Sequence, residues 1–351
     1  MLIDVRKLTV GRPCAIMGTG HTVLGDEHRY DNRRFIMEVL SSVGREALRQ
    51  HLDPQHTLSD EMFLDECDRK FVEATGIRSR YIFPGTTAEL GALAAHACLA
   101  DAGVAAGELE ALIVGTNTGH GYPSTADLIK RLIGAPVQAE SFDLQEACAV
   151  GAVAVQLGWE KVRSGVYRRV LVVCAEKASL LASPEDYKVA NLFGDAAFAL
   201  LLGPAEQEQF LFFDCGSDPG NGQAEFIIRT TRGFQQKGPS VHKYVGTEIP
   251  KLLDEVFQQL ELNPNAVDHF FPHQPSAKTI AFLLHMLRKR WPSFQAMVHQ
   301  NVEVMGNTSG ACTGWMISQA RLEGMLKQEQ MCLVSTFGSG MSFGHYAFIV
   351  R

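Results

Sequence analysis

The sequence lacks several features that would indicate particular classes of protein. No apolar run reaches the roughly 18 residues that a membrane-spanning helix needs, and the N-terminus MLIDVRKLTV lacks the apolar stretch of a signal peptide. Basic residues are not in excess, because 32 Lys and Arg accompany 39 Asp and Glu. The resulting net charge of −7 argues against a nucleic-acid partner, which needs a basic field. We therefore expect a cytoplasmic protein with no membrane partner and no nucleic-acid partner.

The eight cysteines form no CxxC pair and show no metal-ligand spacing. In a chain of 351 residues they are typical of reduced thiols, most of which pack as small buried hydrophobes. Gly18-Thr19-Gly20 is not followed by a glycine at position 23, so the dinucleotide fingerprint is incomplete. The sequence thus predicts no bound metal and no permanently bound cofactor.

Short apolar runs alternate with Ala-rich stretches along most of the chain. We expect strands at 111–116, 168–176, 196–203, 209–214, 267–273, 332–338 and 345–350, and helices at 87–102, 147–163, 248–260, 276–290 and 309–327. This alternation predicts an α/β layered fold. A break at 203–208, which contains Pro204, predicts two units, 1–205 and 206–351. Residues 21–60 are polar and poorly periodic, and we interpret them as an insertion or a mobile segment over the core.

Cys148 stands between a predicted short strand, SFDL, and a helix that begins just after it. A thiol at this junction faces the positive end of the helix, which would lower its pKa and raise its thiolate fraction. The neighbours Ala147, Ala149 and Gly151 are small and leave space around the sulfur. The alternative is one more buried cysteine in an Ala-rich helix.

Two further polar residues lie at the ends of predicted elements. His273 follows the apolar run HFFP where a helix should begin, and strand ends in α/β folds collect reacting groups. A hydrogen-bonded histidine in a turn is the alternative. Asn307 lies in a Gly-bracketed turn, where its amide either caps the next helix or donates to a carbonyl oxygen. The Gly-rich turn 337–344 is typical of a hairpin, and it also lets backbone N–H groups converge on a developing oxyanion.

These motifs, in this order, resemble the ketoacyl-ACP synthase III branch of the thiolase superfamily. The matching segments are TGIRSRYI (75–82), SFDLQEACA (141–149), NLFGDAAFALLLG (191–203), PHQPSAK (272–278), GNTSGA (306–311) and FGSGMSFG (337–344). The resemblance runs from about Cys14 to Arg351. It implies two similar α/β halves packed in a five-layered α-β-α-β-α arrangement, usually as a homodimer. The N-terminal half would carry the nucleophile, and the C-terminal half the histidine and the asparagine.

The resemblance also implies roles for particular residues. The family's Cys-His-Asn triad is matched by Cys148, His273 and Asn307. The oxyanion hole for acyl transfer would use the backbone N–H groups of Cys148 and of Ser339, where the family has glycine. Tyr122 falls where the family places an aromatic residue that reaches into the acyl tunnel of the partner subunit.

The implied reaction has two halves. The Cys148 thiolate attacks a thioester of coenzyme A or of an acyl carrier protein and retains the acyl group. A malonyl-type thioester then loses carbon dioxide, and the N–H groups of His273 and Asn307 stabilise the enolate. Attack of the resulting carbanion on the acyl-cysteine gives a β-ketoacyl product. We therefore expect an acyltransferase of fatty-acid or polyketide-type biosynthesis.

Some residues depart from the family pattern. Lys70 and Ala74 stand where a tryptophan and an arginine commonly hold the adenine end of coenzyme A, which argues against a coenzyme A primer bound in the usual way. Glu146 replaces a residue that is usually small and apolar, and it is either a solvated strand-end residue or an extra acid or base. With the 21–60 segment, these changes favour a specialised ketosynthase over the enzyme that starts bulk fatty-acid synthesis.

The predicted helix after His273 carries four basic residues. In the family this helix offers basic residues to an acidic carrier protein, so the sequence predicts a carrier partner; a solvated helix face is the alternative. The four residues are Lys278, Arg288, Lys289 and Arg290.

Three other functions stay open at the level of sequence. The Cys148 acyl group could pass to an oxygen or nitrogen nucleophile. The presence of Asn307 argues against this function, because decarboxylation is the step that most needs a second amide donor. Two acyl thioesters could condense without decarboxylation, which would require a base such as Glu146. A non-catalytic partner subunit is the last alternative, and the complete triad argues against it.

Overall fold

The computed structural model describes residues 1–230 and 233–351, whose strands form two large sheets and two two-stranded sheets. The first sheet has the order β2-β8-β7-β5-β6 and is built from β2 (Cys14–His21), β5 (Ala111–Gly115), β6 (Glu140–Leu144), β7 (Val170–Lys177) and β8 (Asp195–Pro204). The second has the order β1-β9-β15-β14-β12-β13 and is built from β1 (Leu2–Asp4), β9 (Phe210–Ser217), β12 (Val267–Pro272), β13 (Met297–Val298), β14 (Met331–Phe337) and β15 (Ser342–Ile349). The two-stranded sheets pair β3 (Arg29–Asp31) with β4 (Ser79–Tyr81), and β10 (Ile227–Thr230) with β11 (Gly233–Gln236); the second pair is a hairpin.

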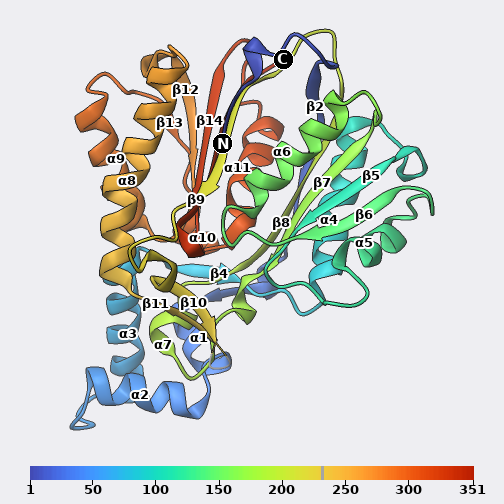
Figure 1. Ribbon diagram of the computed structural model, residues 1–351. Coiled ribbons are helices and arrows are strands. Elements are labelled where there is room, and N and C mark those ends of the chain that lie inside the picture. The colour runs from blue at the N-terminus through green and yellow to red at the C-terminus, as the bar shows by residue number, and fades with distance from the viewer. Residues whose placement is uncertain (231–232) are drawn as a thin grey trace.

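Six helices and the two sheets make five layers in the described part of the chain (Figure 1). Between the sheets lie α6 (Val150–Arg163) and α11 (Cys312–Leu322). The outer face of the first sheet is covered by α4 (Thr87–Ala102) and α5 (Thr125–Ile133), and that of the second by α8 (Gly238–Gln259) and α9 (Ala277–Arg290). The buried apolar side chains form one cluster at each of these three levels. The expected α-β-α-β-α arrangement is therefore confirmed.

The two sheets are formed by the same succession of elements. The first half runs β2-α4-β5-α5-β6-α6-β7-β8, and the second runs β9-α8-β12-α9-β13-α11-β14-β15. In each half the strand next to one edge of the sheet pairs in parallel with both of its neighbours: β5 pairs with β6 and β7, and β12 pairs with β13 and β14. β1 precedes both halves and pairs with β9, so the second sheet contains residues from both predicted units. The boundary between units 1–205 and 206–351 stays a prediction.

Two helices differ from their expected bounds. α8 begins at Gly238, ten residues before the expected start at 248, although Pro250 inside it cannot donate a backbone hydrogen bond. A Cβ on Gly246 would lie 1.9 Å from the ring of Phe282, so this glycine lets α8 and α9 pack closely. α11 ends at Leu322 instead of 327, because Gly324 adopts a left-handed conformation with φ +66°.

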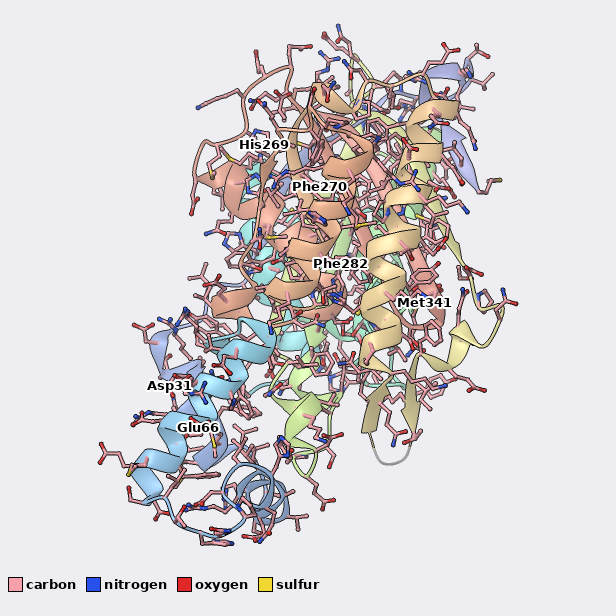
Figure 2. The ribbon with its side chains drawn as sticks, turned by 90° about the vertical axis from the view of Figure 1, so that its left-hand side faces the viewer. Asp31, Glu66, His269, Phe270, Phe282 and Met341 are labelled. Carbon is pink, nitrogen blue, oxygen red and sulfur yellow. The ribbon has the colours of Figure 1, made fainter. Side chains whose placement is uncertain are left out.

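Residues 26–75, here called the arm, correct the expectation for residues 21–60. In place of a poorly periodic segment they contain α1 (Asn32–Glu38), α2 (Ser42–Leu52) and α3 (Asp60–Thr75). Phe35, Ile36, Leu40 and Leu48 are buried in the cluster that also includes residues of α8 and α9. The arm extends below the layered body, where Figure 2 labels Asp31 and Glu66. The arm therefore has an apolar face that packs on the body, although its overall composition is polar.

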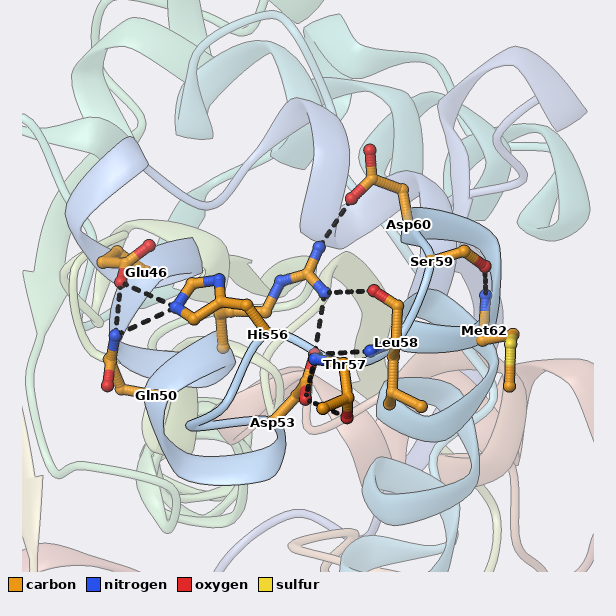
Figure 3. A network of polar contacts seen from close by, with 10 residues as sticks. Glu46, Gln50, Asp53, His56, Thr57, Leu58, Ser59, Asp60 and Met62 are labelled. Atoms are coloured by element: carbon orange, nitrogen blue, oxygen red, sulfur yellow. Dashed lines mark hydrogen bonds and ion pairs between the residues drawn. The ribbon is translucent and has the colours of Figure 1, made fainter.

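Asp53 fixes the loop that joins α2 to α3 (Figure 3). Its carboxylate accepts hydrogen bonds from the backbone N–H groups of Thr57 at 2.8 Å and Leu58 at 3.0 Å. Arg49 pairs with Asp53 at 3.1 Å and with Asp60 at 2.5 Å. Burial acts to raise the pKa of Asp53, but these hydrogen bonds outweigh it and hold the pKa at about 2. The loop is therefore closed by an ionised carboxylate.

Two short helices complete the described structure: α7 (Tyr187–Ala190), which packs on α2, and α10 (Val302–Met305). None of the helices in residues 1–230 and 233–351 has the length and apolar character required to traverse a lipid bilayer.

Candidate active site

Cys148 is held in a tight turn between β6 and α6. Ala147, directly before it, has φ +45°, a left-handed conformation that residues with a side chain rarely adopt. A Cβ on Gly338 would lie 2.5 Å from the backbone N of Cys148 and 2.9 Å from the Cβ of Ala147. Only glycine therefore allows the turn between β14 and β15 to approach the Cys148 backbone this closely.

The Cys148 side chain, which is partly buried, lines a cavity of about 340 Å³. Apolar, polar and charged residues from six regions of the chain surround this cavity. They come from the turn before α6, the β10-β11 hairpin, the loops after β5 and β7, and the turns before α11 and β15: Asn117, Gln145, Glu146, Ala147, Leu181, Ile227, Ile228, Arg229, Phe234, Ser309, Ser339 and Gly340.

Burial raises the pKa of the Cys148 thiol to about 12. A hydrogen bond from Ser309, whose Oγ lies 3.6 Å from the sulfur, acts in the opposite direction, and the nearby Glu176 raises the pKa further. The expected lowering of this pKa is therefore wrong, because removal of the thiol from water raises it. The thiol needs a proton acceptor before it can attack.

His273 follows β12 and is 2% exposed. Its backbone N–H donates to the carbonyl of Ser335 at 2.8 Å, and its ring meets that of Phe337 edge-on at 5.0 Å. The Nδ1 atom lies 3.1 Å from the Sγ of Cys312, the first residue of α11. Burial lowers the pKa of His273 to about 3, so the ring is neutral at physiological pH.

Asn307 lies in the turn between α10 and α11 and is 7% exposed. Its backbone N–H donates to the carbonyl of Leu192 at 2.7 Å. Its side-chain Oδ1 accepts the backbone N–H of Ser309 at 2.9 Å, which orients the amide and leaves Nδ2 as its donor.

Glu176 is a residue of this site that the sequence analysis did not select. It ends the apolar run of β7 and is fully buried. Its Oε1 accepts hydrogen bonds from Asn117 Nδ2 at 2.6 Å and Ser309 Oγ at 3.1 Å. Its Oε2 accepts from the backbone N of Asn117 at 3.0 Å and from Thr118 Oγ1 at 3.1 Å. The sequence signal that could have revealed Glu176 is an acidic residue at the end of the otherwise apolar strand VLVVCA.

Comparison with known proteins assigns the chain to a family. A family model described as 3-oxoacyl-[acyl-carrier-protein (ACP)] synthase III matches residues 142–219, and its C-terminal counterpart matches residues 257–349. A β-ketoacyl-[acyl-carrier-protein] synthase III from Serratia proteamaculans (strain 568) is 31% identical over 294 residues, covering 81% of this chain and 91% of that protein. The chain belongs to this synthase III family. It is therefore an acyltransferase of the condensing-enzyme class.

Solved structures show the same fold. The 3-oxoacyl-[acyl-carrier-protein] synthase III from Aquifex aeolicus VF5 has a TM-score of 0.81 at 24% identity, covering 96% of this chain and 100% of that chain. The priming β-ketosynthase of the R1128 polyketide pathway has a TM-score of 0.80 at 23% identity, covering 98% of each chain. The predicted thiolase-like fold is thus confirmed.

The remaining predicted site residues of this synthase III chain fall into two groups. Glu146 and Ser339 line the cavity with Cys148, and burial raises the pKa of Glu146. Tyr122 is fully exposed and lies outside the residues that line the cavity. The basic residues of α9 are also outside it and separate along the helix, with Lys278 roughly 15 Å from the other three. One of them, Arg290, pairs with Asp254 of α8 at 3.0 Å.

No cluster of His, Cys, Asp and Glu suited to a metal ion occurs within the described residues 1–230 and 233–351.

Proposed function

We propose that this protein is a β-ketoacyl synthase that loads an acyl group on Cys148 and condenses it with a malonyl-type thioester by decarboxylation. The observation that carries this proposal is the link between Cys148 and Asn307 through Ser309, whose backbone N–H donates to Asn307 Oδ1 at 2.9 Å and whose Oγ lies 3.6 Å from Cys148 Sγ. His273 joins this group through Cys312, whose sulfur lies 3.1 Å from its Nδ1. A thiol sits at the start of α6, a neutral histidine follows β12, and an oriented amide precedes α11.

Cys312 supports the role of His273 as an N–H donor. Burial raises the pKa of Cys312 to about 12, so it remains a thiol, and the backbone N–H of Gln274 is directed at its sulfur. The S–H of Cys312 then donates to His273 Nδ1 at 3.1 Å. A neutral imidazole that accepts at Nδ1 carries its proton on Nε2. His273 Nε2 and Asn307 Nδ2 are two N–H donors for the enolate oxygen that decarboxylation generates.

The turn between β14 and β15 supports an oxyanion hole for the acyl-transfer half-reaction. Gly338 approaches the backbone N of Cys148, and the next residue, Ser339, lines the cavity. The Oγ of Ser339 donates to the carbonyl of Ile227 at 2.5 Å, which ties this turn to the β10-β11 hairpin. The backbone N–H groups of Cys148 and Ser339 would together receive the negative charge of the tetrahedral intermediate.

The substrates we propose are an acyl primer and a malonyl-type extender carried by acyl carrier protein. The curated relative is named for the acyl carrier protein, and α9 presents exposed Lys278, Arg288 and Lys289 to an acidic partner. Lys70, at a position that commonly holds adenine in the family, instead pairs with Glu73 at 3.4 Å. This pairing favours a carrier-bound primer over coenzyme A.

We also propose that the enzyme acts as a homodimer. β6 is an edge strand of the first sheet, and it leads directly to the turn that carries Cys148. An edge strand can pair with the same strand of a second copy, which would place two active sites beside the interface. The fully exposed Tyr122 is then available to the partner.

Glu146 supports one alternative reaction. It lines the cavity two residues before Cys148, and burial raises its pKa, which makes it a better proton acceptor. A base at this position would allow two acyl thioesters to condense without loss of carbon dioxide.

The test is intact-protein mass spectrometry after incubation with acyl-CoA and acyl-carrier thioesters. Wild type should gain one acyl group, Cys148→Ala should gain none, and Cys215→Ala, which changes another partly buried cysteine, should load as wild type. Adding a malonyl carrier should release carbon dioxide and a β-ketoacyl product. Product formation without carbon dioxide would establish the alternative reaction, and failure of every thioester to load Cys148 would refute the proposal.

A further inference from the structure

Glu176 has no part in the reaction proposed above, and its position in the interior is costly. A carboxyl group without water contact is retained only where other groups compensate it. Four donor groups do so, namely the backbone N–H and Nδ2 of Asn117, the hydroxyl of Thr118 and the hydroxyl of Ser309. The last of these also contacts the nucleophile.

Ser309 links the carboxyl group to the thiol. Its Oγ lies 3.1 Å from Glu176 Oε1 and 3.6 Å from Cys148 Sγ. A hydroxyl carries one proton to donate and has lone pairs to accept. The single hydroxyl proton of Ser309 can be donated either to the sulfur or to the carboxylate. When it goes to the carboxylate, an oxygen lone pair is free to accept the S–H of Cys148, and a continuous path then runs from the thiol to Glu176.

The surrounding structure holds this path in place. Asn117 Nδ2 lies 2.8 Å from the carbonyl of Ala147 and 3.3 Å from Ser309 Oγ, so one amide contacts both the turn that carries Cys148 and the hydroxyl next to its sulfur. Ser309 itself has φ +52°, a left-handed conformation that is unusual for a residue with a side chain. The backbone is thus strained at the residue that joins the acid to the thiol.

We propose that Ser309 and Glu176 form a proton relay that accepts the thiol proton of Cys148 while the acyl group is loaded. The proposal deepens the proposed function and rests on the role of Cys148 as the nucleophile. Ser309 contacts the reacting sulfur, and Glu176 acts through Ser309 as the terminal proton acceptor.

The loading step balances as follows. The S–H proton of Cys148 passes to Ser309 Oγ as the hydroxyl proton of Ser309 passes to Glu176 Oε1, and the sulfur forms its bond to the thioester carbonyl carbon. When the tetrahedral intermediate collapses, the bond to the carrier sulfur breaks. The proton returns from Glu176 through Ser309 to the departing carrier thiolate. The products are the acyl-cysteine and a neutral carrier thiol, and the relay is restored.

The electrostatics of the cluster agree with this geometry. Burial raises the pKa of Glu176 to about 7, against the lowering effect of its four hydrogen bonds. An acceptor that titrates near the working pH is the efficient choice for a general base. The ionisable groups that face Glu176 are Cys148 from the start of α6 and Cys174 from β7, and burial keeps both protonated. Lys177 points elsewhere, because its Nζ donates to the carbonyl of Gly85 at 2.5 Å.

Two readouts test the relay. The first is the rate of iodoacetamide alkylation of Cys148 between pH 6 and 10, followed by peptide mass spectrometry, which does not depend on the identity of the substrate. We expect an inflection near pH 7 in wild type, and its loss together with at least about 100-fold slower alkylation at pH 7 in Glu176→Gln. Ser309→Ala should show the same loss, because it interrupts the path while leaving the carboxyl group in place.

The second readout separates the two half-reactions. Enzyme that has been acylated beforehand should condense with malonyl carrier at the wild-type rate in both variants, whereas acyl loading should be slow. Asp195→Asn is the matched control, since Asp195 is a buried carboxyl group that accepts from Phe83 and Ser179 and not from Ser309. Thermal unfolding by circular dichroism reports whether each variant is folded.

Several results would overturn the relay. Folded variants that alkylate and load at the wild-type rate would exclude it, as would equal losses in loading and condensation. Slow alkylation in Glu176→Gln with normal alkylation in Ser309→Ala would exclude Ser309 as the link. If Cys148 alkylates with the predicted profile and no thioester loads, the proposed function fails while the relay stands.

Discussion

The substitution Gly338→Ala tests the geometry of the oxyanion hole directly. Gly338 has φ −156°, an extended conformation open to alanine, so the change introduces no backbone strain. Its effect is steric, because the new Cβ would lie 2.5 Å from the backbone N of Cys148. Contacts below 3.0 Å do not occur for real Cβ atoms, so the two backbone segments must separate by at least about 0.5 Å.

This separation moves the N–H of Ser339 away from the N–H of Cys148. A misplacement of about 1 Å in a catalytic arrangement costs on the order of 100-fold in rate. Loss of one oxyanion donor costs about 2.7–4 kcal/mol, or roughly 100- to 1000-fold. We therefore expect Gly338→Ala to load acyl groups about 100-fold more slowly than wild type, between full function and complete loss of a donor.

The assay is the rate of acyl-enzyme formation in single-turnover mass spectrometry. Gly107→Ala is the matched control, because a Cβ at Gly107 meets no atom within 4 Å and no positive φ is involved. The control should load at the wild-type rate and unfold at the wild-type temperature. Loading by a folded Gly338→Ala variant at the wild-type rate would show that the turn after β14 is not part of the oxyanion hole.

Substitutions at four further positions test other parts of the reasoning. Asn307→Ala should leave acyl loading intact and slow condensation by roughly 100- to 1000-fold, as measured by product release from acylated enzyme. Cys312→Val should slow condensation about fivefold, because losing one hydrogen bond of about 1 kcal/mol frees the His273 tautomer, whereas Cys312→Ser should retain wild-type rates. The pKa of Asp53 is lowered in the folded state, so its contribution to stability is present above about pH 4 and is lost as the pH falls towards 2. Asp53→Asn should therefore unfold at a lower temperature than wild type at pH 7, and the two unfolding temperatures should converge in acid. Lys289→Glu should raise KM for carrier-bound thioesters and not for coenzyme A thioesters, and equal KM changes for both would argue against docking on α9.

Much of the fold followed from local patterns. Several strands have uninterrupted buried apolar runs, such as the six buried apolar residues that begin β7, and these are visible as Val- and Leu-rich stretches in the sequence. The helices flanked by Gly or Pro were harder to place. α8 continues through Pro250 because the packing of α9 against Gly246 stabilises a helix that local propensity alone would interrupt.

The arm was the largest departure from the sequence-based prediction. Its apolar residues are few and separated by charged ones, so they do not form a continuous stripe. Phe35 and Leu48 become buried only because residues distant in the chain, such as Val189, join the same cluster. Contacts of this kind depend on tertiary structure, and the polar composition of residues 21–60 could not reveal them.

The residues of the candidate site could be proposed from sequence where they stand in motifs. Properties that depend on burial, such as pKa values, could not. Cys148, His273 and Asn307 stand in recognisable motifs at the ends of predicted elements. The sign of the Cys148 pKa shift was not predictable, since it depends on how completely the β10-β11 hairpin and the turn before β15 exclude water. Glu176 was not predictable either, because only its four hydrogen bonds in the structure distinguish it from a solvated acidic residue at the end of a strand.

The repeated order of elements explains why these residues meet. Cys148 immediately precedes α6, and Asn307 lies in the turn before α11, the helix that occupies the equivalent position in the second half. Asn117 follows β5 as His273 follows β12, again at equivalent positions. Because α6 and α11 lie together between the sheets, the turns before them and the carboxyl ends of the parallel strands converge from both halves. In the proposed site one half would supply the thiol and Glu176, and the other would supply Ser309 and the two N–H donors, so neither half alone would contain the site.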